Sequence, residues 1–290
     1  MMNPWLKSAE FKHLYPFRSH YLNLGNNNLH YVDEGEGQVM LMLHGNPTWS
    51  FYYRNLVKAF SGNHRVVVPD HMGCGLSDRP QDYEYSLKNH IDNVYKLIRF
   101  LDLKNIILVV HDWGGAIGMG LLTKYPHLFS KVVILNTAAF PDADIPKRIN
   151  LLRQGKFGEF LTRKFNLFAW PATFMTTTKT LPTFVKRAYL APYDSWENRV
   201  AVARFVQDIP MEKTHPTYPV LSEIEQKLPS IAIPKLILWG GKDFCFNDHF
   251  FNRWLEIFPD AHYKYYENAG HYVIEDELED VVQNIWNFIS

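Results

Sequence analysis

The sequence predicts an α/β protein built on a mostly parallel β-sheet with helices on both faces. Three continuous apolar runs, at residues 39–43, 106–110 and 132–135, have the composition of strands buried on both faces. Between such runs lie segments in which apolar residues recur every three or four positions, as at 87–101, which is typical of amphipathic helices. Strands that alternate with helices pair in parallel, because each helix returns the chain to the same end of the sheet.

The N-terminal part is expected to add an antiparallel edge to this sheet. Strand-like runs at 19–24 and 29–34 are separated by Gly-Asn-Asn-Asn, residues that tolerate positive φ, so we expect a hairpin. The elements expected up to residue 139 are strand 39–43, helix 49–60, strand 65–69, helix 87–101, strand 106–110, a helix that begins near 114, and strand 132–135.

The alternation of strands and helices stops after residue 139. Residues 140–229 contain aromatic-rich helical stretches and many prolines but no buried strand, which predicts a helical cap inserted over a pocket. Strand patterns return at 234–239 and 261–266, which brings the expected number of strands to eight, and a last helix is expected over 273–289. The predicted organisation is a core in two parts, 1–139 and 230–290, with the cap at 140–229 between them.

Composition and charge narrow the classes of partner. A chain of 290 residues with 47% hydrophobic side chains can bury one large core. Thirty Lys and Arg residues against thirty Asp and Glu residues give no net charge, so nothing suggests nucleic acid, a polyanion or an anionic membrane surface as a partner. We expect a small, uncharged, apolar substrate and no nucleic acid. No run approaches the ~20 apolar residues of a membrane span and the start lacks a signal-peptide core, so a cytoplasmic protein is expected.

Nothing in the sequence predicts a metal ion or another cofactor. The thirteen histidines form no H-E-x-x-H motif, and the two cysteines are not closely spaced as in a zinc site. Cys74 and Cys245 are too few for a disulfide framework and are expected as free thiols in loops. The glycines at 73 and 75 lack the Gly-Lys-Ser/Thr ending of a phosphate loop, which favours a structural turn.

The segment 109–116 carries the clearest chemical signal. A buried strand turns directly into a helix, and Asp112 stands at the corner before Trp113, Gly114 and Gly115. This is the pattern of a nucleophile elbow, usually G-x-S-x-G, except that Val110 replaces the first glycine and Asp112 replaces the serine. A carboxylate is ionised at neutral pH and can attack a saturated carbon to form an ester. The alternative is that Asp112 only caps the following helix.

Two further residues follow in the order expected of the α/β-hydrolase fold, which is nucleophile, acid and histidine. Asp243 comes after the strand at 234–239, and His271 comes after the strand at 261–266. His271 could turn one ring nitrogen toward Asp112 while Asp243 holds the other. Alternatively, His271 caps a helix and Asp243 is a turn residue. An acid after the strand before the cap is a known variation, but Asn136-Thr137 stands there.

Three short motifs follow predicted strands: His44-Gly45-Asn46-Pro47-Thr48, His111-Asp112-Trp113-Gly114-Gly115 and Ala269-Gly270-His271. They resemble those of the haloalkane dehalogenases and their close relatives, and the resemblance covers essentially the whole chain. It implies that backbone N–H groups after His-Gly and after the nucleophile form an oxyanion hole, and that the side chains of Asn46 and Trp113 bind the departing anion. Two neutral donors in an apolar pocket suit that task.

The resemblance extends over four longer motifs, at residues 44–54, 73–78, 204–210 and 270–276. These resemble one branch of the relatives, the β-lactone decarboxylases of bacterial long-chain olefin biosynthesis. This resemblance implies conversion of a cis-dialkyl β-lactone to a cis-alkene and carbon dioxide, with other enzymes of the olefin pathway as candidate partners. Haloalkane dehalogenase stays the alternative, because the shared triad does not separate the two reactions.

An epoxide hydrolase and a non-catalytic binding protein are two other functions that the same fold could serve. An epoxide hydrolase needs cap tyrosines to protonate the opening oxygen, for which Tyr189, Tyr193 and Tyr218 are candidates, whereas Asn46 suits an anion better. A non-catalytic binding protein of the same fold is disfavoured by the complete triad.

Aromatic residues of the cap have two predicted roles. They either line an apolar channel or form the core of the cap itself. The residues are Phe157, Phe160, Phe165, Phe168, Trp170 and Phe174.

Overall fold

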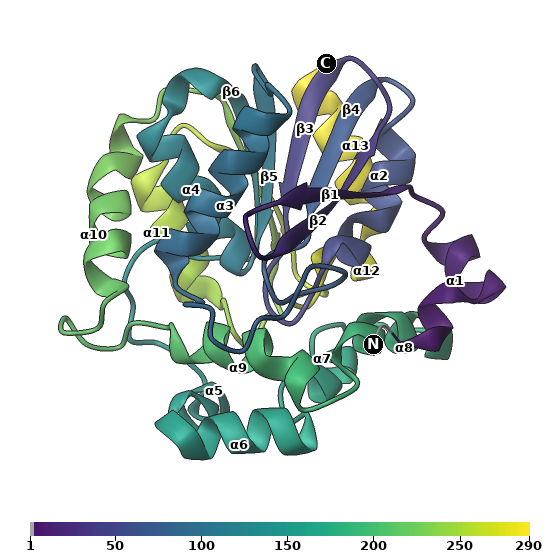
Figure 1. The fold of residues 1–290 in the computed structure, drawn as a ribbon. Helices are drawn as coiled ribbons and strands as arrows, with labels where there is room; N and C mark the ends of the chain where they lie inside the picture. The colour runs from purple at the N-terminus through teal and green to yellow at the C-terminus, as the bar shows by residue number, and fades with distance from the viewer. Residues whose placement is uncertain (1–2) are drawn as a thin grey trace.

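The computed structural model describes residues 3–290 and shows one sheet between two layers of helices, with further helices across one end (Figure 1). Only the first two pairs of neighbouring strands are antiparallel. The expected mostly parallel sheet of eight strands, with the hairpin as its antiparallel edge, is confirmed. In spatial order the strands are β1 (Ser19–Asn23), β2 (Asn28–Glu34), β4 (His64–Pro69), β3 (Gln38–Leu43), β5 (Ile106–His111), β6 (Phe129–Leu135), β7 (Lys235–Gly240) and β8 (His262–Tyr266).

Alternate residues of the central strands face two separate cores. On β5, Leu108 and Val110 lie in one core, and Ile107 and Val109 lie in the other. Both faces are buried, which explains why this strand is apolar at every position before its terminal histidine. The first core is covered by α3 (Leu87–Phe100), α4 (Trp113–Lys124), α10 (Tyr218–Lys227) and α11 (Asp248–Ile257), and the second by α2 (Arg54–Phe60) and α13 (Leu278–Ile289) (Figure 1).

The helices from α5 to α9, which follow β6, cross the carboxyl end of the parallel strands, at the bottom of Figure 1. Residues 140–229 are all described and contain no strand, so their predicted helical nature is confirmed. The division of the chain at 140 and 229 stays a prediction, because α10 packs against α4 beside the sheet. The helices that cross the strand ends are α5 (Lys147–Arg153), α6 (Gly155–Phe165), α7 (Ala169–Met175), α8 (Thr183–Leu190) and α9 (Val200–Gln207).

Two expected helices differ in detail from the structure. The helix expected over 49–60 begins as the 3₁₀ turn η2 (Ser50–Tyr53) before α2, and the helix expected over 273–289 is interrupted at Glu277. The interruption separates α12 (Val273–Asp276) from α13 and leaves the Asp276 carboxylate facing the loop that carries His271. Later 3₁₀ turns are η3 (Pro126–Leu128), η4 (Ala191–Tyr193), η5 (Glu197–Arg199) and η6 (Leu228–Ser230).

The N-terminal segment packs against the cap. It contains η1 (Pro4–Lys7) and α1 (Ala9–Leu14), and the Arg187 guanidinium on α8 lies 4.8 Å from the centre of the Trp5 ring. Within residues 3–290, every helix is too short or too polar to cross a bilayer.

Candidate active site

The turn between β5 and α4 holds Asp112 in an unusual backbone conformation, with φ 52° and ψ −129°. Positive φ is strained for a side chain other than glycine, so the surroundings must enforce it. Gly114 and Gly115 let the turn pack closely against its neighbours. A Cβ at Gly114 would overlap the backbone of Leu43, and a Cβ at Gly115 would overlap the side chain of Thr137. The Thr137 hydroxyl also donates to the backbone oxygen of Asp112, which fixes the turn.

The Asp112 carboxylate is buried among hydrogen-bond donors. The backbone N–H of Asn46 donates to Oδ1 at 2.6 Å, and the backbone N–H of Trp113 also donates to the carboxylate. A Cβ on Gly45 would overlap the Asp112 side chain, so the His-Gly turn must contain glycine. Burial raises the pKa of Asp112 above its ordinary value, although the positive charge of His271 and the two N–H groups partly offset this effect.

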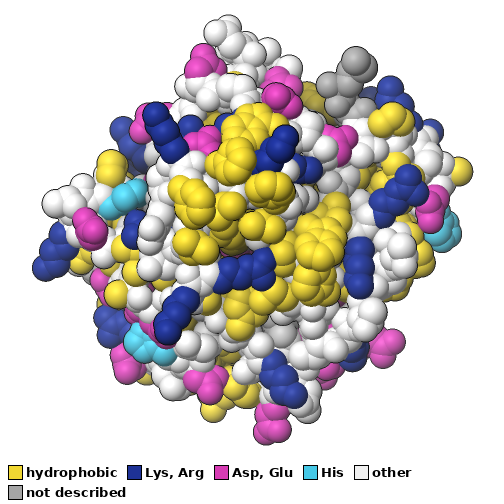
Figure 2. All heavy atoms as spheres, turned by 90° about the horizontal axis from the view of Figure 1, so that it is seen from below, with side chains coloured by type: hydrophobic (Ala, Val, Ile, Leu, Met, Phe, Trp, Pro, Cys, Tyr) yellow, Lys and Arg dark blue, Asp and Glu magenta, His cyan; other side chains and the backbone are white. Residues whose placement is uncertain are grey.

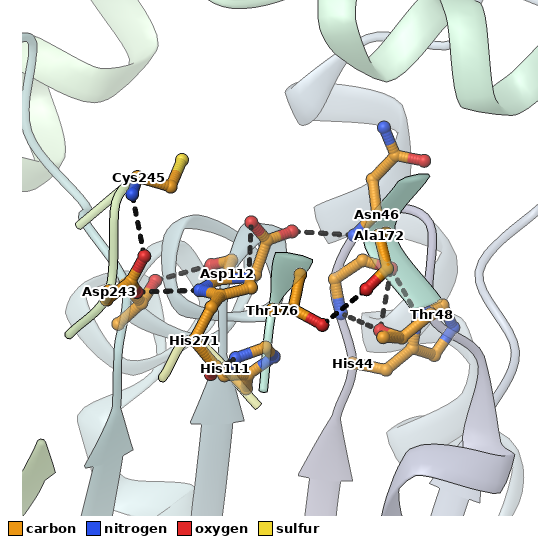
Figure 3. A network of polar contacts seen from close by, with 12 residues as sticks. His44, Asn46, Thr48, His111, Asp112, Ala172, Thr176, Asp243, Cys245 and His271 are labelled. Atoms are coloured by element: carbon orange, nitrogen blue, oxygen red, sulfur yellow. Dashed lines mark hydrogen bonds and ion pairs between the residues drawn. The ribbon is translucent and has the colours of Figure 1, made fainter. Parts of the chain in front are cut away.

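His271 and Asp243 meet beside this carboxylate, as Figure 3 shows. The Nδ1–H of His271 donates to Oδ2 of Asp243 at 2.7 Å, and Nε2 lies 3.6 Å from Oδ2 of Asp112. Burial lowers the pKa of His271, but Asp243 and then Asp112 more than compensate, so its pKa lies above the ordinary value. The three residues that the sequence predicted as a unit are therefore in contact or nearly so.

Residues that sequence reasoning missed hold the His271 loop. His111, at the end of β5, donates from Nε2 to the backbone oxygen of His271 at 2.9 Å. The Asp276 carboxylate accepts the N–H of Gly270 at 2.8 Å and the N–H groups of Thr178 and Lys179 at 2.9 Å each. One carboxylate thus ties the histidine loop to the segment between α7 and α8. The only signal in the sequence was that an acidic residue, Asp276, stands five positions after the histidine.

A buried ion pair makes a second connection between core and cap. Arg54 donates to both carboxylate oxygens of Glu275, at 2.6 and 2.9 Å, and the Tyr189 hydroxyl of α8 donates to the same carboxylate. Bidentate geometry orients both groups, so the helix after His271 is held against α2 and α8.

The predicted anion-binding side chains have different surroundings. Asn46 donates one amide N–H to the backbone oxygen of Val202 on α9 at 3.1 Å, so part of its donor capacity is already used. The indole N–H of Trp113 takes part in none of the hydrogen bonds within residues 3–290, and its ring packs 5.4 Å from that of Phe205. Both side chains line a pocket next to Asp112. Their binding of an anion stays a prediction.

Two apolar pockets meet at Asp112. They share Asn46, Asp112, Ile149, Phe168 and Cys245. We call the first pocket A; besides the shared residues it is lined by side chains that include Trp113, Phe140, Val206, Ile209, Leu221 and Phe250. We call the second pocket B; besides the shared residues it is lined by side chains that include Pro47, Leu167, Ala172, Met175, Phe244 and His271.

The cap aromatics only partly match their predicted roles. Phe168 lines both pockets, as the channel hypothesis requires. The other five are neither channel lining nor cap core, so both predictions are wrong for them. Their exposed fractions are Phe157 61%, Phe160 45%, Phe165 57%, Trp170 54% and Phe174 48%.

The two cysteines, the cap tyrosines and the acidic and histidine side chains were the other candidate groups. Cys74 and Cys245 are free thiols, and burial raises the pKa of Cys245 well above its ordinary value, so a neutral thiol faces the pockets. The hydroxyls of Tyr189 and Tyr193 donate to Glu275 and to the backbone of Thr48, and neither pocket is lined by a tyrosine. The lack of a tyrosine in either pocket disfavours an epoxide hydrolase.

Within residues 3–290, no group of three or more His, Cys, Asp or Glu side chains could hold a metal ion.

Comparison with known proteins covers nearly the whole chain. Residues 38–278 match the family described as alpha/beta hydrolase fold. A cis-3-alkyl-4-alkyloxetan-2-one decarboxylase of Shewanella oneidensis is 45% identical over 96% of this chain and 90% of its own. One of Xanthomonas campestris pv. campestris is 40% identical over 90% and 91%. Haloalkane dehalogenase 2 of Mycobacterium tuberculosis is 30% identical over 94% and 95%.

Solved structures agree on the fold. A haloalkane dehalogenase from Bradyrhizobium elkani superposes with a TM-score of 0.88 at 22% identity, covering 94% of this chain and 97% of that one. One from Paraglaciecola agarilytica NO2 has a TM-score of 0.84 at 24% identity, covering 98% and 96%.

Proposed function

The chain belongs to the alpha/beta hydrolase fold family, and we propose that within this family it decarboxylates a cis-dialkyl β-lactone to a cis-alkene and carbon dioxide. The two relatives named for decarboxylation of such a lactone are 45% and 40% identical to it, and the dehalogenase from Mycobacterium tuberculosis is 30% identical.

The meeting of two apolar pockets at Asp112 carries this proposal. A dialkyl β-lactone has alkyl chains on adjacent ring carbons, so one ring at Asp112 can send one chain into pocket A and the other into pocket B. A simple haloalkane has a single chain and would leave one pocket empty.

We assign the nucleophilic role to Oδ2 of Asp112. The other oxygen, Oδ1, is held by the N–H of Asn46, while Oδ2 faces His271. Attack of Oδ2 on the saturated ring carbon breaks its bond to the ring oxygen and inverts that carbon. The products of this step are an ester of Asp112 and a free carboxylate on the neighbouring carbon.

The second step needs no water. When the new carboxylate lies anti to the Asp112 oxygen, its carbon–carbon bond breaks, carbon dioxide leaves, and the electron pair forms the alkene as Asp112 departs. Inversion followed by anti loss converts a cis-lactone to a cis-alkene. In this scheme the indole N–H of Trp113 and the remaining amide N–H of Asn46 hold the lactone carboxylate.

Haloalkane hydrolysis is the second candidate, supported by the dehalogenase relatives and by the same carboxylate beside His271. A comparison of products separates the two. A synthetic cis-β-lactone and a bromoalkane are offered to equal amounts of enzyme, and alkene and alcohol are measured by gas chromatography. We expect alkene from the lactone at a much higher kcat/KM than alcohol from the bromoalkane. The reverse ranking would identify a dehalogenase.

Blocking one pocket at a time should select between unsymmetrical lactones. Ile209→Trp would fill pocket A and Ala172→Trp would fill pocket B. Each variant should lose about tenfold or more in kcat/KM for a lactone with two long chains, because several buried CH₂ groups are displaced. With one chain shortened to methyl, each variant should accept only one of the two positional isomers, and the two variants should prefer opposite isomers. Identical profiles for both variants would contradict one chain per pocket.

The rate should fall in acid because Asp112 must be ionised to attack. Burial raises the pKa of Asp112, so protonation sets in at a higher pH than for an exposed aspartate. We therefore expect kcat/KM for the lactone to decline on the acid side, with an apparent pKa above that of an exposed aspartate. Circular dichroism over the same pH range separates this titration from unfolding. A profile that stays flat to a pH of about 4 would argue against a buried carboxylate nucleophile.

A further inference from the structure

The outer surface of the cap exposes more large hydrophobic side chains than the rest of the molecule does. Figure 2 looks onto this surface and shows hydrophobic side chains gathered at its centre with Lys and Arg side chains around them. Of the thirteen large hydrophobic residues that are exposed in residues 3–290, nine lie within 151–196 and a tenth is Phe244, which lines pocket B. We define the cap face as Leu151, Phe157, Phe160, Phe165, Trp170, Phe174, Met175, Phe184, Trp196 and Phe244.

Charge is segregated in the same part of the chain. Residues 145–187 contain nine Lys and Arg residues and one acidic residue, Glu159, and are flanked by Asp142 and Asp144 before them and by Asp194 and Glu197 after them. Because the whole chain has no net charge, the remainder carries a matching negative excess. Glu159 is paired with Arg163 and Arg204, so it does not neutralise the outer cations. Within residues 3–290, no ion pair involves Lys147, Lys156 or Lys164.

The cap face also borders the opening of a pocket. Met175 and Phe244 line pocket B and are 38% and 40% exposed, and the exposed Arg148 stands beside them in the same lining. A molecule lying against the cap face can therefore reach Asp112 through pocket B.

We propose that the cap face docks on the surface of a bilayer that contains anionic lipids. Half-exposed Trp, Phe and Leu side chains interspersed with Lys and Arg have the composition of surfaces that insert their apolar groups at the headgroup level. The excess of cations matches anionic headgroups, and each Lys or Arg near such a surface contributes to binding. A second copy of the chain is a poorer occupant, because two cap faces would bring like charges together.

Docking would give the apolar substrate a dry route to the site. A lactone with two long alkyl chains partitions into lipid, and pocket B would take it from the bilayer without exposing the chains to water. This route depends on the proposed function, whereas the docking depends only on the composition of the surface.

Flotation with vesicles tests the docking without any substrate. The protein is mixed with phosphatidylcholine vesicles or with vesicles containing phosphatidylglycerol, and the bound fraction is measured at low and high salt. We expect binding to rise with phosphatidylglycerol and to weaken with salt. Phe157→Ser with Trp170→Ser, and separately Lys156→Glu with Lys164→Glu, should each weaken binding by about tenfold or more.

A matched control lies outside the cap. Phe100, at the end of α3, is 60% exposed, nearly the same as Phe157 at 61%, so Phe100→Ser is matched to Phe157→Ser alone. Phe100→Ser should leave vesicle binding unchanged, whereas the single variant Phe157→Ser should weaken it. None of the substituted residues lines a pocket, so turnover of detergent-dispersed lactone should also be unchanged.

Three outcomes would overturn the proposal. The first is that the unaltered protein does not bind phosphatidylglycerol vesicles. The second is that the control weakens binding as much as the cap variants do. The third is that the cap residues instead control self-association in gel filtration or capture of an acidic protein. Loss of lactone turnover with intact vesicle binding would count only against the proposed function.

Discussion

Replacing Asp112 with alanine is expected to abolish turnover of both the β-lactone and a bromoalkane, with a loss of about three orders of magnitude or more. The proposed reactions both begin with a bond from this carboxylate to carbon. Asp112 is the one residue that lines both pockets and also contacts the N–H of Asn46 and faces His271. The measurement is kcat/KM for each substrate, with the fold checked by circular dichroism.

Two further variants make this result interpretable. Asp112→Asn keeps the volume of the side chain and tolerates positive φ better than alanine, so it serves if the alanine variant is unstable. Cys245→Ala changes another side chain that lines both pockets, and it should retain activity because the buried thiol is neutral. More than about one hundredth of the original rate in both Asp112 variants would rule out the nucleophile.

The central sheet could be predicted because burial on both faces leaves a strong local pattern. Strand β5 is apolar at five consecutive positions, and the two glycines after Asp112 are required by close backbone contacts. The order of Asp112, Asp243 and His271 could also be predicted, since each follows a strand. The order of the residues along the chain does not determine how far apart their side chains lie, such as the 3.6 Å between Nε2 of His271 and Oδ2 of Asp112.

The parts that were missed depend on contacts between segments distant in the chain. Helix α1 and Trp5 are ordered against α8, and Asp276 acts by reaching the backbone of Thr178. No local pattern in the sequence predicts either contact. Asn46 was predicted to bind an anion, which stays a prediction, and its hydrogen bond to Val202 could not be foreseen because it arises only where the cap lies over the core.

The net charge of zero does not describe how charge is distributed along the chain. Nine Lys and Arg residues and one acidic residue lie within 145–187, and the rest of the chain carries the matching negative excess. The proposed docking of the cap face on an anionic bilayer rests on this uneven distribution, whereas the expectation from the sequence rested on the sum.

His271 should have different roles in the two candidate reactions. Asp243 and Asp112 raise its pKa, which favours the imidazolium form beside the carboxylate. In decarboxylation, an imidazolium next to Oδ2 would stabilise the departing Asp112 carboxylate. In dehalogenation, forming the ester removes the charge of Asp112, which lowers the pKa of His271 and frees Nε2 to activate a water molecule.

The variant His271→Asn should therefore separate the reactions. Without the base, a bromoalkane should alkylate Asp112 and remain attached, giving a stable mass increase on the peptide that contains Asp112. The lactone should still give alkene, at a rate reduced by about tenfold to a hundredfold, because the fragmentation itself regenerates the carboxylate. An enzyme that accumulates a lactone adduct would instead require the histidine for turnover.

Turnover of the unaltered protein in heavy-oxygen water is the companion measurement. Hydrolysis of an ester of Asp112 puts one water oxygen into the carboxylate at each cycle, whereas inversion and anti fragmentation return both original oxygens. After many turnovers of lactone, mass spectrometry should show Asp112 unlabelled, while turnover of bromoalkane should label it. Attack at the lactone carbonyl would form an anhydride at Asp112, and hydrolysis of that anhydride could introduce label as well. Label that enters Asp112 in step with alkene formation would therefore exclude the water-free route.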